Sequence, residues 1–439
     1  MLDAIRDRTE EIEFSGRTDS VDVNDVLQDL DKATPEPDGL LVFTAPYGTV
    51  PDDLIKLGMP IVAVNRLLTG CATQNFYPFK DKPILTSVLP AHCDKDPAVY
   101  EHRMADIADK LKTVSAFARM KNARILVVTD KPPLGAFEPS KHQFESDRKE
   151  YEDTYVQNVK QVFDAELVNI PQETLFEKIQ SADEDQATQI AERWLREAIG
   201  MRGTNRSEVI NSAKLYLAMK ELMQENRCNA ITTEGFGWPP LGYKAAAERN
   251  IPSQGIATSQ LLTDGVPSAS ETLIDCLITQ QLALYMTGSG GLLGDYNIDP
   301  LNKTAVVCHC EGTFKPYNDN RRSPYVLRNL PFFPEKTGGT CAEVHYPIGE
   351  TVTLAKISMY KKKISLSTGT TVSGEELFPY WNDILGRNKI AVRTDAEKLF
   401  ENVDWKTFGH HRVAFFGDFR QQFKDLAKLI GFDIVEKDR

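Results

Sequence analysis

The stretch 306–314, VVCHCEGTF, places a histidine between two cysteines and so raises the question of a metal site. If the stretch is a β-strand, Cys308 and Cys310 point to one face while His309 and Glu311 point to the other. The Cys-His-Cys triplet then cannot bind one ion, and a zinc site needs about four converging ligands. The sequence therefore favours His309 and Glu311, which share a face, as the pair that could take part in chemistry.

Glu234 stands at the carboxyl end of a predicted strand, in the stretch 229–235, NAITTEG. Ligands of open α/β sheets bind beyond the carboxyl ends of the strands, which makes this a suitable position for a catalytic carboxylate. A turn residue beside Gly235 is the structural alternative. The positional rule alone does not choose between these two interpretations.

Glu271 and Asp275 lie in the stretch 268–286, SASETLIDCLITQQLALYM, whose length and composition predict a helix. Their i,i+4 spacing would place both carboxylates on one helical face, where like charges repel unless a cation or a shared proton compensates them. In the alternative interpretation, Glu271 favours the helix dipole from the first turn and Asp275 faces solvent. Both interpretations remain open for Glu271, whereas the structural one is favoured for Asp275.

The glycine-rich stretch 287–296, TGSGGLLGDY, resembles a phosphate-binding loop only superficially. It lacks the lysine of the G-x-x-x-x-G-K-[ST] motif, and it lacks the order of strand, glycines and helix that a dinucleotide site needs. We therefore expect a flexible connection here. Asp295, near the end of the stretch, remains a further candidate for a site.

Four of the seven histidines follow residue 300, at positions 309, 345, 410 and 411. His410 and His411 begin a predicted strand, so their imidazoles would point to opposite faces and at most one could enter a given site. A histidine from a β-rich domain that faces carboxylates from an α/β domain would suit a divalent-metal site or an acid/base set. Each histidine, taken alone, also suits a structural role.

The elements that must position these residues change in kind along the chain. In the first 300 residues, helical patterns alternate with buried apolar runs at 40–46, 61–65 and 123–130. This alternation predicts parallel sheets. After residue 300 there is little helix before a closing helix at 418–431, and strand-like runs dominate at 304–310, 351–359, 363–368 and 389–394. The pattern predicts an α/β protein with an N-terminal α/β domain, a second α/β domain and a C-terminal β-rich domain, over 1–120, 121–300 and 301–439.

The composition is that of a folded protein, with 41% hydrophobic and 26% charged residues among 439. The formal net charge of −12 argues against a nucleic-acid partner, because binding to phosphate depends on clustered Lys and Arg. No apolar run approaches the roughly 18 residues of a membrane span, so no membrane partner is expected. The charged N-terminus and the seven scattered cysteines predict a cytoplasmic protein with reduced thiols.

From about residue 165 to the C-terminus, the sequence resembles the L-fucose isomerase and L-arabinose isomerase group of sugar isomerases. An acidic helical pattern and a long amphipathic one come first. The motifs that then carry the resemblance follow in the order NAITTEG, SASETLIDCLITQQLALYMTG, HCEGTF, PIGETVTLAKIS and GHHRVAFFGDF. The resemblance implies two Rossmann-like α/β domains, a C-terminal β-barrel-like domain and a homo-oligomer whose sites lie near subunit contacts.

The resemblance also implies an activity, the interconversion of an aldose and a ketose with a divalent metal, usually manganese. Matched residue by residue, His309 falls on the HC motif, and His410 or His411 falls on the C-terminal histidine. Glu234 matches the strand-end glutamate. The implied metal ligands are Glu234 and one of the two adjacent histidines, and the implied catalytic residues are Glu234, Glu271 and His309.

One position departs from the family's helix motif, C-E-x-D. Leu273 stands where the metal-binding aspartate is expected, and an apolar side chain cannot bind a cation. Glu271 is then the candidate to replace that ligand. Isomerisation through an enediol needs a base and a positive group that stabilises the developing oxyanion, which is the role of a hard divalent ion.

Three interpretations remain, and the first is a metal-assisted isomerase with a rearranged ligand set. The second is a metal-free carbohydrate enzyme of the same fold that uses Glu234, His309 and a C-terminal histidine as acid/base groups. The third is a non-catalytic sugar-binding protein. The ligand expected in all three is a small sugar, and the candidate residues for binding its hydroxyl groups are Trp238, Tyr317 and Asn318.

Overall fold

The computed structural model describes residues 1–17, 22–44, 48–67, 79, 82–131, 148–235, 248–319, 321–330, 338–383 and 386–439. The chain is mixed α/β and forms two compact units. The first comprises Met1–Met120 with Gln421–Asp433, and the second comprises Lys121–Arg420 with Ile434–Arg439. Within the described residues, no helix is both long and apolar enough to cross a membrane.

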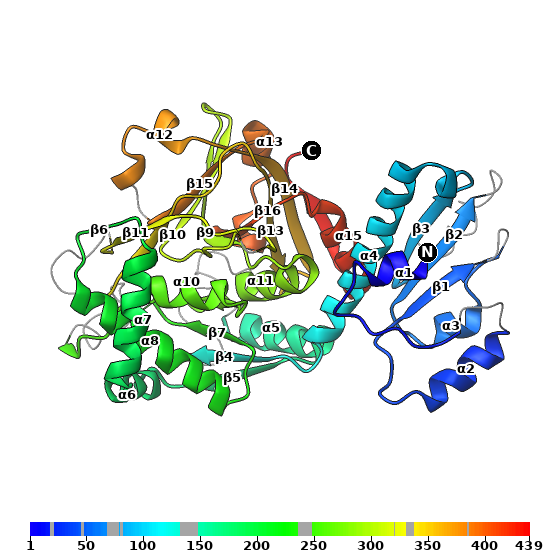
Figure 1. Ribbon diagram of the computed structural model, residues 1–439, viewed down its shortest axis with the longest axis horizontal. Helices are drawn as coiled ribbons and strands as arrows, with labels where there is room; N and C mark the ends of the chain where they lie inside the picture. The colour runs from blue at the N-terminus through cyan, green and yellow to red at the C-terminus, as the bar shows by residue number, and fades with distance from the viewer. Residues whose placement is uncertain are drawn as a thin grey trace. The chain divides into compact units, whose positions relative to one another are not determined.

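The first unit contains a parallel three-stranded sheet in the order β1-β2-β3 (Figure 1). Its strands are β1 (Leu40–Thr44), β2 (Ile61–Leu67) and β3 (Ile84–Pro90). The predicted parallel pairing of the runs near 40 and 61 is confirmed, with Leu40 opposite Ile61. Its helical segments are α1 (Leu2–Arg6), α2 (Val23–Lys32), α3 (Asp52–Lys56), η2 (Cys93–Lys95), α4 (Pro97–Met120) and most of α15 (Arg420–Ile430).

The second unit opens with another parallel sheet, in the order β5-β4-β7-β8. Its strands are β4 (Arg124–Val128), β5 (Glu166–Ile170), β7 (Ala230–Thr233) and β8 (Ser268–Ala269). Two of its helices begin where the sequence supplies a cap, because Asp183 and Asn205 accept hydrogen bonds from the exposed backbone N–H groups of the first turn. The helices are α5 (Arg148–Phe163), α6 (Gln172–Ser181), α7 (Glu184–Glu197), α8 (Arg206–Glu225) and α10 (Gly255–Thr263).

The rest of this unit is built on a large sheet in the order β13-β16-β9-β10-β15-β14-β17. A further pairing of β13 with β14 joins the two sides of the sheet, so six strands close into a ring around an apolar core. The strands are β9 (Leu292–Asp299), β10 (Thr304–His309), β13 (Thr351–Ser358), β14 (Lys363–Val372), β15 (Asn388–Arg393), β16 (His411–Phe416) and β17 (Asp433–Glu436).

A smaller sheet, in the order β12-β11-β6, accompanies the ring. Its strands are β6 (Gly200–Arg202), β11 (Tyr325–Arg328) and β12 (Cys341–Val344). Helix α11 (Ile274–Thr287) packs against β7 and β8 of the parallel sheet and also against β13 and β16 of the ring (Figure 1). The remaining short helices are α12 (Gly374–Leu377), η3 (Trp381–Asp383), α13 (Ala396–Glu401) and α14 (Trp405–Phe408).

Two expectations about local structure were wrong. The helix expected over 268–286 begins only at Ile274, because Glu271 and Thr272 adopt positive φ values of 64° and 54° that a right-handed helix cannot contain. Glu271 and Asp275 therefore do not share a helical face, and Asp275 is buried, where its Oδ1 accepts a hydrogen bond from Met359 N at 3.1 Å. The flexible connection expected over 287–296 ends early, because strand β9 begins at Leu292.

Candidate metal centre

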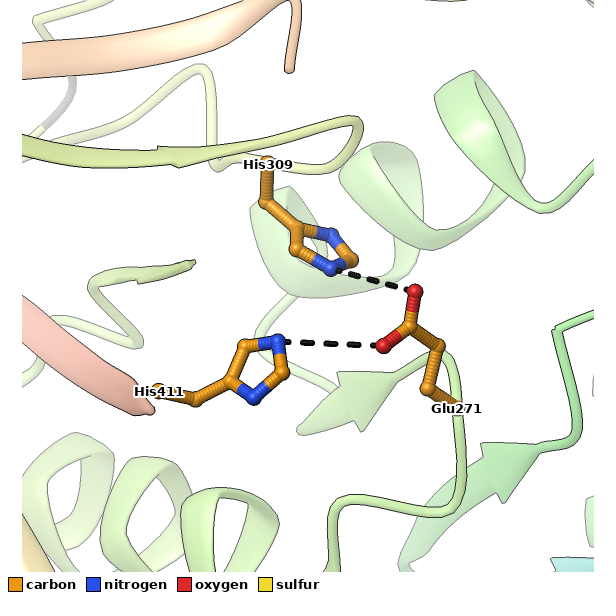
Figure 2. Close-up of side chains that lie close together, drawn as sticks. All are labelled: Glu271, His309 and His411. Carbon is orange, nitrogen blue, oxygen red and sulfur yellow. Dashed lines mark ion pairs between the residues drawn. The ribbon is translucent and has the colours of Figure 1, made fainter. Parts of the chain in front are cut away.

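Three side chains from distant parts of the second unit converge on one point (Figure 2). The two carboxylate oxygens of Glu271 each face one imidazole: Oε1 lies 3.6 Å from His309 Nε2, and Oε2 lies 3.7 Å from His411 Nε2. One potential ligand atom from each residue lies within 4.8 Å of the others. We call Glu271, His309 and His411 the Glu-His-His group.

Glu271 is presented by a tight turn between β8 and α11. Thr272 N donates a hydrogen bond of 2.9 Å to the carbonyl of Thr233, the last residue of β7, so the turn lies against the carboxyl end of that strand. Leu273, the residue that replaces the expected aspartate, is fully buried and precedes the first residue of α11. The leucine therefore anchors the turn, while Glu271 extends from it toward the imidazoles (Figure 2).

His309 is the last residue of β10, and it is held by the carboxylate of Glu311. The Glu311 carboxylate contacts Nδ1 of the imidazole, which leaves Nε2 directed at Glu271. Burial opposes protonation of His309, but the adjacent Glu311 and Glu271 carboxylates outweigh it and raise its pKa well above the usual value. The sequence predicted the pair correctly, although Glu311 lies just beyond the strand whose alternation suggested it.

His411 begins β16 and has only 1% of its side chain exposed. Neither of its ring nitrogens has a hydrogen-bond partner among the described residues. Burial lowers its pKa well below the usual value, and the positive charges of His410 and His309 lower it further. A buried neutral imidazole with unused nitrogens is energetically unfavourable unless something binds it, and it is the form in which histidine binds metals.

Asp295 approaches the same imidazole from β9, where it pairs with His411 across the two strands. Its Oδ1 lies 3.4 Å from His411 Nε2 and 3.6 Å from His410 Nε2, so both adjacent histidines approach one carboxylate. The expectation that only one of them could do so was wrong, because His410 precedes the strand and alternation does not apply to it. Burial raises the pKa of Asp295. The positive charges of His309 and His410 act to lower it, but the effect of burial is larger.

Glu234 follows β7, as predicted, and is buried. Its Oε1 accepts a hydrogen bond from the Thr129 hydroxyl, and its Oε2 accepts one of 2.7 Å from Gln172 Nε2. Glu234 is not a member of the Glu-His-His group or of the neighbouring group formed by Asp295 and the two adjacent histidines. Its backbone is nevertheless close to the Glu271 turn, because Thr233, the preceding residue, accepts the bond from Thr272.

Two of the three expected sugar-binding residues can be placed by their contacts. Tyr317 packs against Phe416 at the core of the ring, with ring centroids 5.7 Å apart, and the Arg321 guanidinium lies over its face. Asn318 lies against Gly288, where a Cβ would come within 2.6 Å of the Asn318 Cβ. Trp238 lies outside the described residues.

Two imidazoles and one carboxylate, with Asp295 beside them, form a donor set that suits a divalent transition metal such as manganese, iron or zinc. The nitrogens of His411, which have no hydrogen-bond partner among the described residues, fit such an ion. The Glu311 carboxylate contacts Nδ1 of His309, as a carboxylate often does on the far nitrogen of a metal-bound histidine. No protein-family model matches this sequence, and a comparison with curated proteins finds no significant relative.

Proposed function

We propose that this protein is a metal-assisted aldose-ketose isomerase in which Glu271, His309 and His411 bind a divalent cation, Mn²⁺ in the first instance. The observation that carries the proposal is His411, a buried imidazole whose two nitrogens have no hydrogen-bond partner within the described chain and which faces a carboxylate and a second imidazole. The sequence motifs that resemble the L-fucose and L-arabinose isomerase group supply the reaction class. In this assignment Glu271 takes the place of the aspartate that Leu273 removes.

Each residue has a defined part in this proposal. A bound divalent cation would polarise the sugar oxygens at C1 and C2 and so favour the enediol. Glu311 fixes the His309 ring through Nδ1, so that Nε2 stays available for binding. The turn of Glu271 and Thr272 orients the carboxylate toward both imidazoles.

Proton transfer between C2 and C1 requires a base beside the cation. Asp295 and Glu234 are the two carboxylates available for this step. Asp295 lies next to His411, whereas both oxygens of Glu234 already accept hydrogen bonds from Thr129 and Gln172. We therefore assign the proton transfer to Asp295. Glu234 has a structural role in supporting the site.

The proposal extends to the rest of the expected biology. It includes Rossmann-like character for the two parallel sheets, a small sugar as substrate, a homo-oligomeric assembly and a cytoplasmic location. These points rest on the sequence resemblance and on composition.

Metal binding is the first test. We expect chelator-treated protein to bind Mn²⁺ at about one ion per chain in a calorimetric titration, and we expect His411→Asn and Glu271→Gln to abolish that binding. His345→Asn is the matched control, because this half-exposed histidine lies outside the Glu-His-His group. Wild-type protein that binds neither Mn²⁺ nor another divalent transition metal would contradict the proposal.

The second test is the reaction itself. The Mn²⁺-loaded protein is incubated with a panel of pentoses and 6-deoxyhexoses in D₂O, and ketose formation is followed by proton NMR together with deuterium uptake next to the carbonyl. We expect conversion that stops with a chelator and that falls by about 10²-fold or more in Asp295→Asn. Stoichiometric metal binding without conversion of any aldose would leave the metal site in place and refute the isomerase assignment.

A further inference from the structure

A second polar cluster lies around Lys389 of β15. Lys389 is paired with Cys308 across these two strands, whereas His309 is paired with Asn388. Because neighbouring residues of a strand point to opposite faces, Lys389 and His309 project in opposite directions. Lys389 is therefore directed away from His309, and among the described residues no member of the cluster belongs to either group of potential metal ligands. His411 and Asp295 lie in register with Cys308 and Lys389, so the cluster neighbours the proposed metal centre.

The cluster consists of Arg328, Glu343, Arg387 and Lys389, and we call it the cationic cluster. Each of the four residues is more than nine-tenths buried. The Arg328 guanidinium contacts the Glu343 carboxylate. Among the described residues, the charges that act most strongly on Arg387 and Lys389 include the Arg328 guanidinium and a single carboxylate, that of Glu343. Within the part of the chain that the structure describes, three cations thus face one carboxylate, which leaves an excess of two positive charges among these buried residues.

Neutral groups hold the remaining two cations without neutralising them. Arg387 donates from Nε to the carbonyl of Asn329 at 2.9 Å, and Lys389 donates from Nζ to the carbonyl of Gly386 at 3.1 Å. Burial lowers the pKa of Lys389 and of Arg387, as expected where a positive charge is poorly compensated. Burying a charge is unfavourable unless a counter-charge is nearby, so the cluster is suited to an anion.

The cluster continues to the protein surface through the smaller sheet. Arg202 of the edge strand β6 pairs with Arg328 in the neighbouring strand β11, and partners in register on adjacent strands share a face of the sheet. Arg202 is exposed, and the half-exposed His345 lies 3.9 Å from the Glu343 carboxylate. A small ion could therefore approach from this edge, whereas a macromolecule could not reach the buried residues.

We propose that Arg202, Arg328, Arg387 and Lys389, arranged around Glu343, form a binding site for a small phosphate-class dianion. The dianion would be either inorganic phosphate or the phosphoryl group of a metabolite. A dianion matches the excess of two positive charges, and guanidinium groups match the geometry of phosphate oxygens. The site regulates or stabilises the fold and takes no part in proton transfer.

The test uses the full chain after removal of metal, so that phosphate cannot bind through a cation. Thermal unfolding is recorded with inorganic phosphate and with sodium chloride at equal ionic strength. We expect phosphate at a hundredfold excess over its Kd to raise the melting temperature of the wild type by about 4 °C. In Arg202→Gln we expect the phosphate Kd, measured by calorimetry, to rise at least several-fold. Arg206→Gln, which removes an exposed arginine of α8 nearby in sequence, should bind phosphate like the wild type.

Lys389→Met gives the sharper result, because it removes a buried cation and keeps an apolar chain beside Trp381. Without phosphate, this variant should melt at or above the wild-type temperature, since an uncompensated charge is gone. Its response to phosphate should be lost. A destabilised Lys389→Met protein together with a wild type that does not respond to phosphate would show that another group already compensates the charge, and it would overturn the proposal.

Two further arms separate the possible outcomes. Glu271→Gln should keep the full phosphate response, because Glu271 is not a member of the cationic cluster; a loss of the response there would place phosphate at the metal centre and refute the new site. Titration with glucose 6-phosphate then identifies the source. Tighter binding of the ester than of inorganic phosphate would assign the site to a phosphorylated metabolite, and the reverse order would assign it to the free ion.

Discussion

His309 shows how a single residue can be tuned by its neighbours. The Glu311 carboxylate contacts Nδ1 of the ring, and the Glu271 carboxylate faces Nε2. The positive charge of the protonated imidazole is therefore stabilised by a carboxylate at each nitrogen. These two carboxylates raise the pKa of His309 although burial acts in the opposite direction. A metal that binds at Nε2 must displace that stabilised proton.

Metal binding should therefore depend on pH in a predictable direction. Below its raised pKa, His309 is protonated and cannot donate Nε2 to a metal. We expect the affinity for Mn²⁺ to fall by roughly tenfold for each unit of pH below that pKa, with release of about one proton on binding at neutral pH. Calorimetry in two buffers with different heats of ionisation would measure the released proton.

Glu311→Gln provides the matched comparison, because glutamine keeps an oxygen that can accept from Nδ1 and removes the negative charge. The pKa of His309 should fall, and the number of protons released on binding at neutral pH should fall with it. The affinity for Mn²⁺ should also fall, since the carboxylate that contacts Nδ1 of His309 is lost. Equal proton release in the variant and the wild type would show that the Glu311 carboxylate does not control the protonation of His309.

The residues of the Glu-His-His group could be found from the sequence by type and motif, but their arrangement could not. His309 and Glu271 were candidates, and His411 was one of two alternatives. What the sequence did not reveal was the backbone of Glu271, because a positive φ at a glutamate leaves no signal in residue type. Asp295 was hard to find because the glycines before it suggest a loop. Gly288, Gly290 and Gly291 do form the connection after α11, but Gly294 and Asp295 lie within β9.

At the scale of elements, the turn of Glu271 and Thr272 is a strained connection that carries one residue of the site. Both residues have positive φ, and a β-branched threonine in this region is disfavoured by the contact of its side chain with the backbone. Such strain persists only where the surroundings enforce it, and it is concentrated at functional sites. Here the bond from Thr272 N to the Thr233 carbonyl and the buried Leu273 hold the turn on both sides.

Thr272→Gly should make the protein more stable and at the same time weaken its binding of Mn²⁺. Glycine adopts positive φ without a clash between side chain and backbone, so we expect a gain of about 1 kcal/mol in the free energy of unfolding. The same freedom should loosen the orientation of Glu271 and weaken Mn²⁺ binding several-fold. Urea unfolding and calorimetric titration measure the two quantities in the same protein.

Lys303→Gly is the control, since Lys303 also has a positive φ, at 52°, in the turn between β9 and β10. Its substitution should change stability in the same direction and leave Mn²⁺ affinity unchanged. If Thr272→Gly binds Mn²⁺ as tightly as the wild type does, the strained turn is not what positions Glu271.

The elements themselves could be predicted better than their connections. The strand-like runs after residue 300 appear as β10, β13, β14 and β15, because their residue types favour pleated, buried surfaces. Closure of the ring could not be predicted. The pairing of β16 with β9, for example, joins His411 to Asp295 across more than a hundred residues, and residue types in either strand do not specify the partner.

At the scale of the whole molecule, the chain returns to its first unit near its end. Residues Gln421–Asp433 belong with Met1–Met120, and Leu429 packs in the core that α4 forms with β2 and β3. The sequence predicted the helix from its apolar spacing but gave no sign of where its apolar face packs. Polar contacts accompany this packing. Gln422 of α15 donates from Nε2 to Asp109 of α4 at 3.1 Å. Lys110 of α4, almost fully buried, contacts Asp106 and lies 3.4 Å from Asp425 of α15.

Asp425→Asn should weaken this association, because the buried ammonium of Lys110 would lose one of the two carboxylates with which it pairs among the described residues. We expect a loss of about 1–3 kcal/mol in the stability of the first unit. Hydrogen exchange followed by mass spectrometry would detect it as faster exchange in peptides from α4 and α15. Asp433→Asn, which changes an exposed carboxylate in the same segment, should leave that exchange unaltered.

The four tryptophans make this prediction specific to one unit. All of them fall between residues 121 and 420, so tryptophan fluorescence reports on the second unit, whereas exchange in α4 reports on the first. If the two units unfold separately, Asp425→Asn accelerates exchange in α4 while the fluorescence midpoint in urea stays at the wild-type value. A midpoint that shifts together with the exchange would mean that the returning segment makes the two units unfold as one. Unchanged exchange in α4 would mean that Asp425 does not stabilise Lys110.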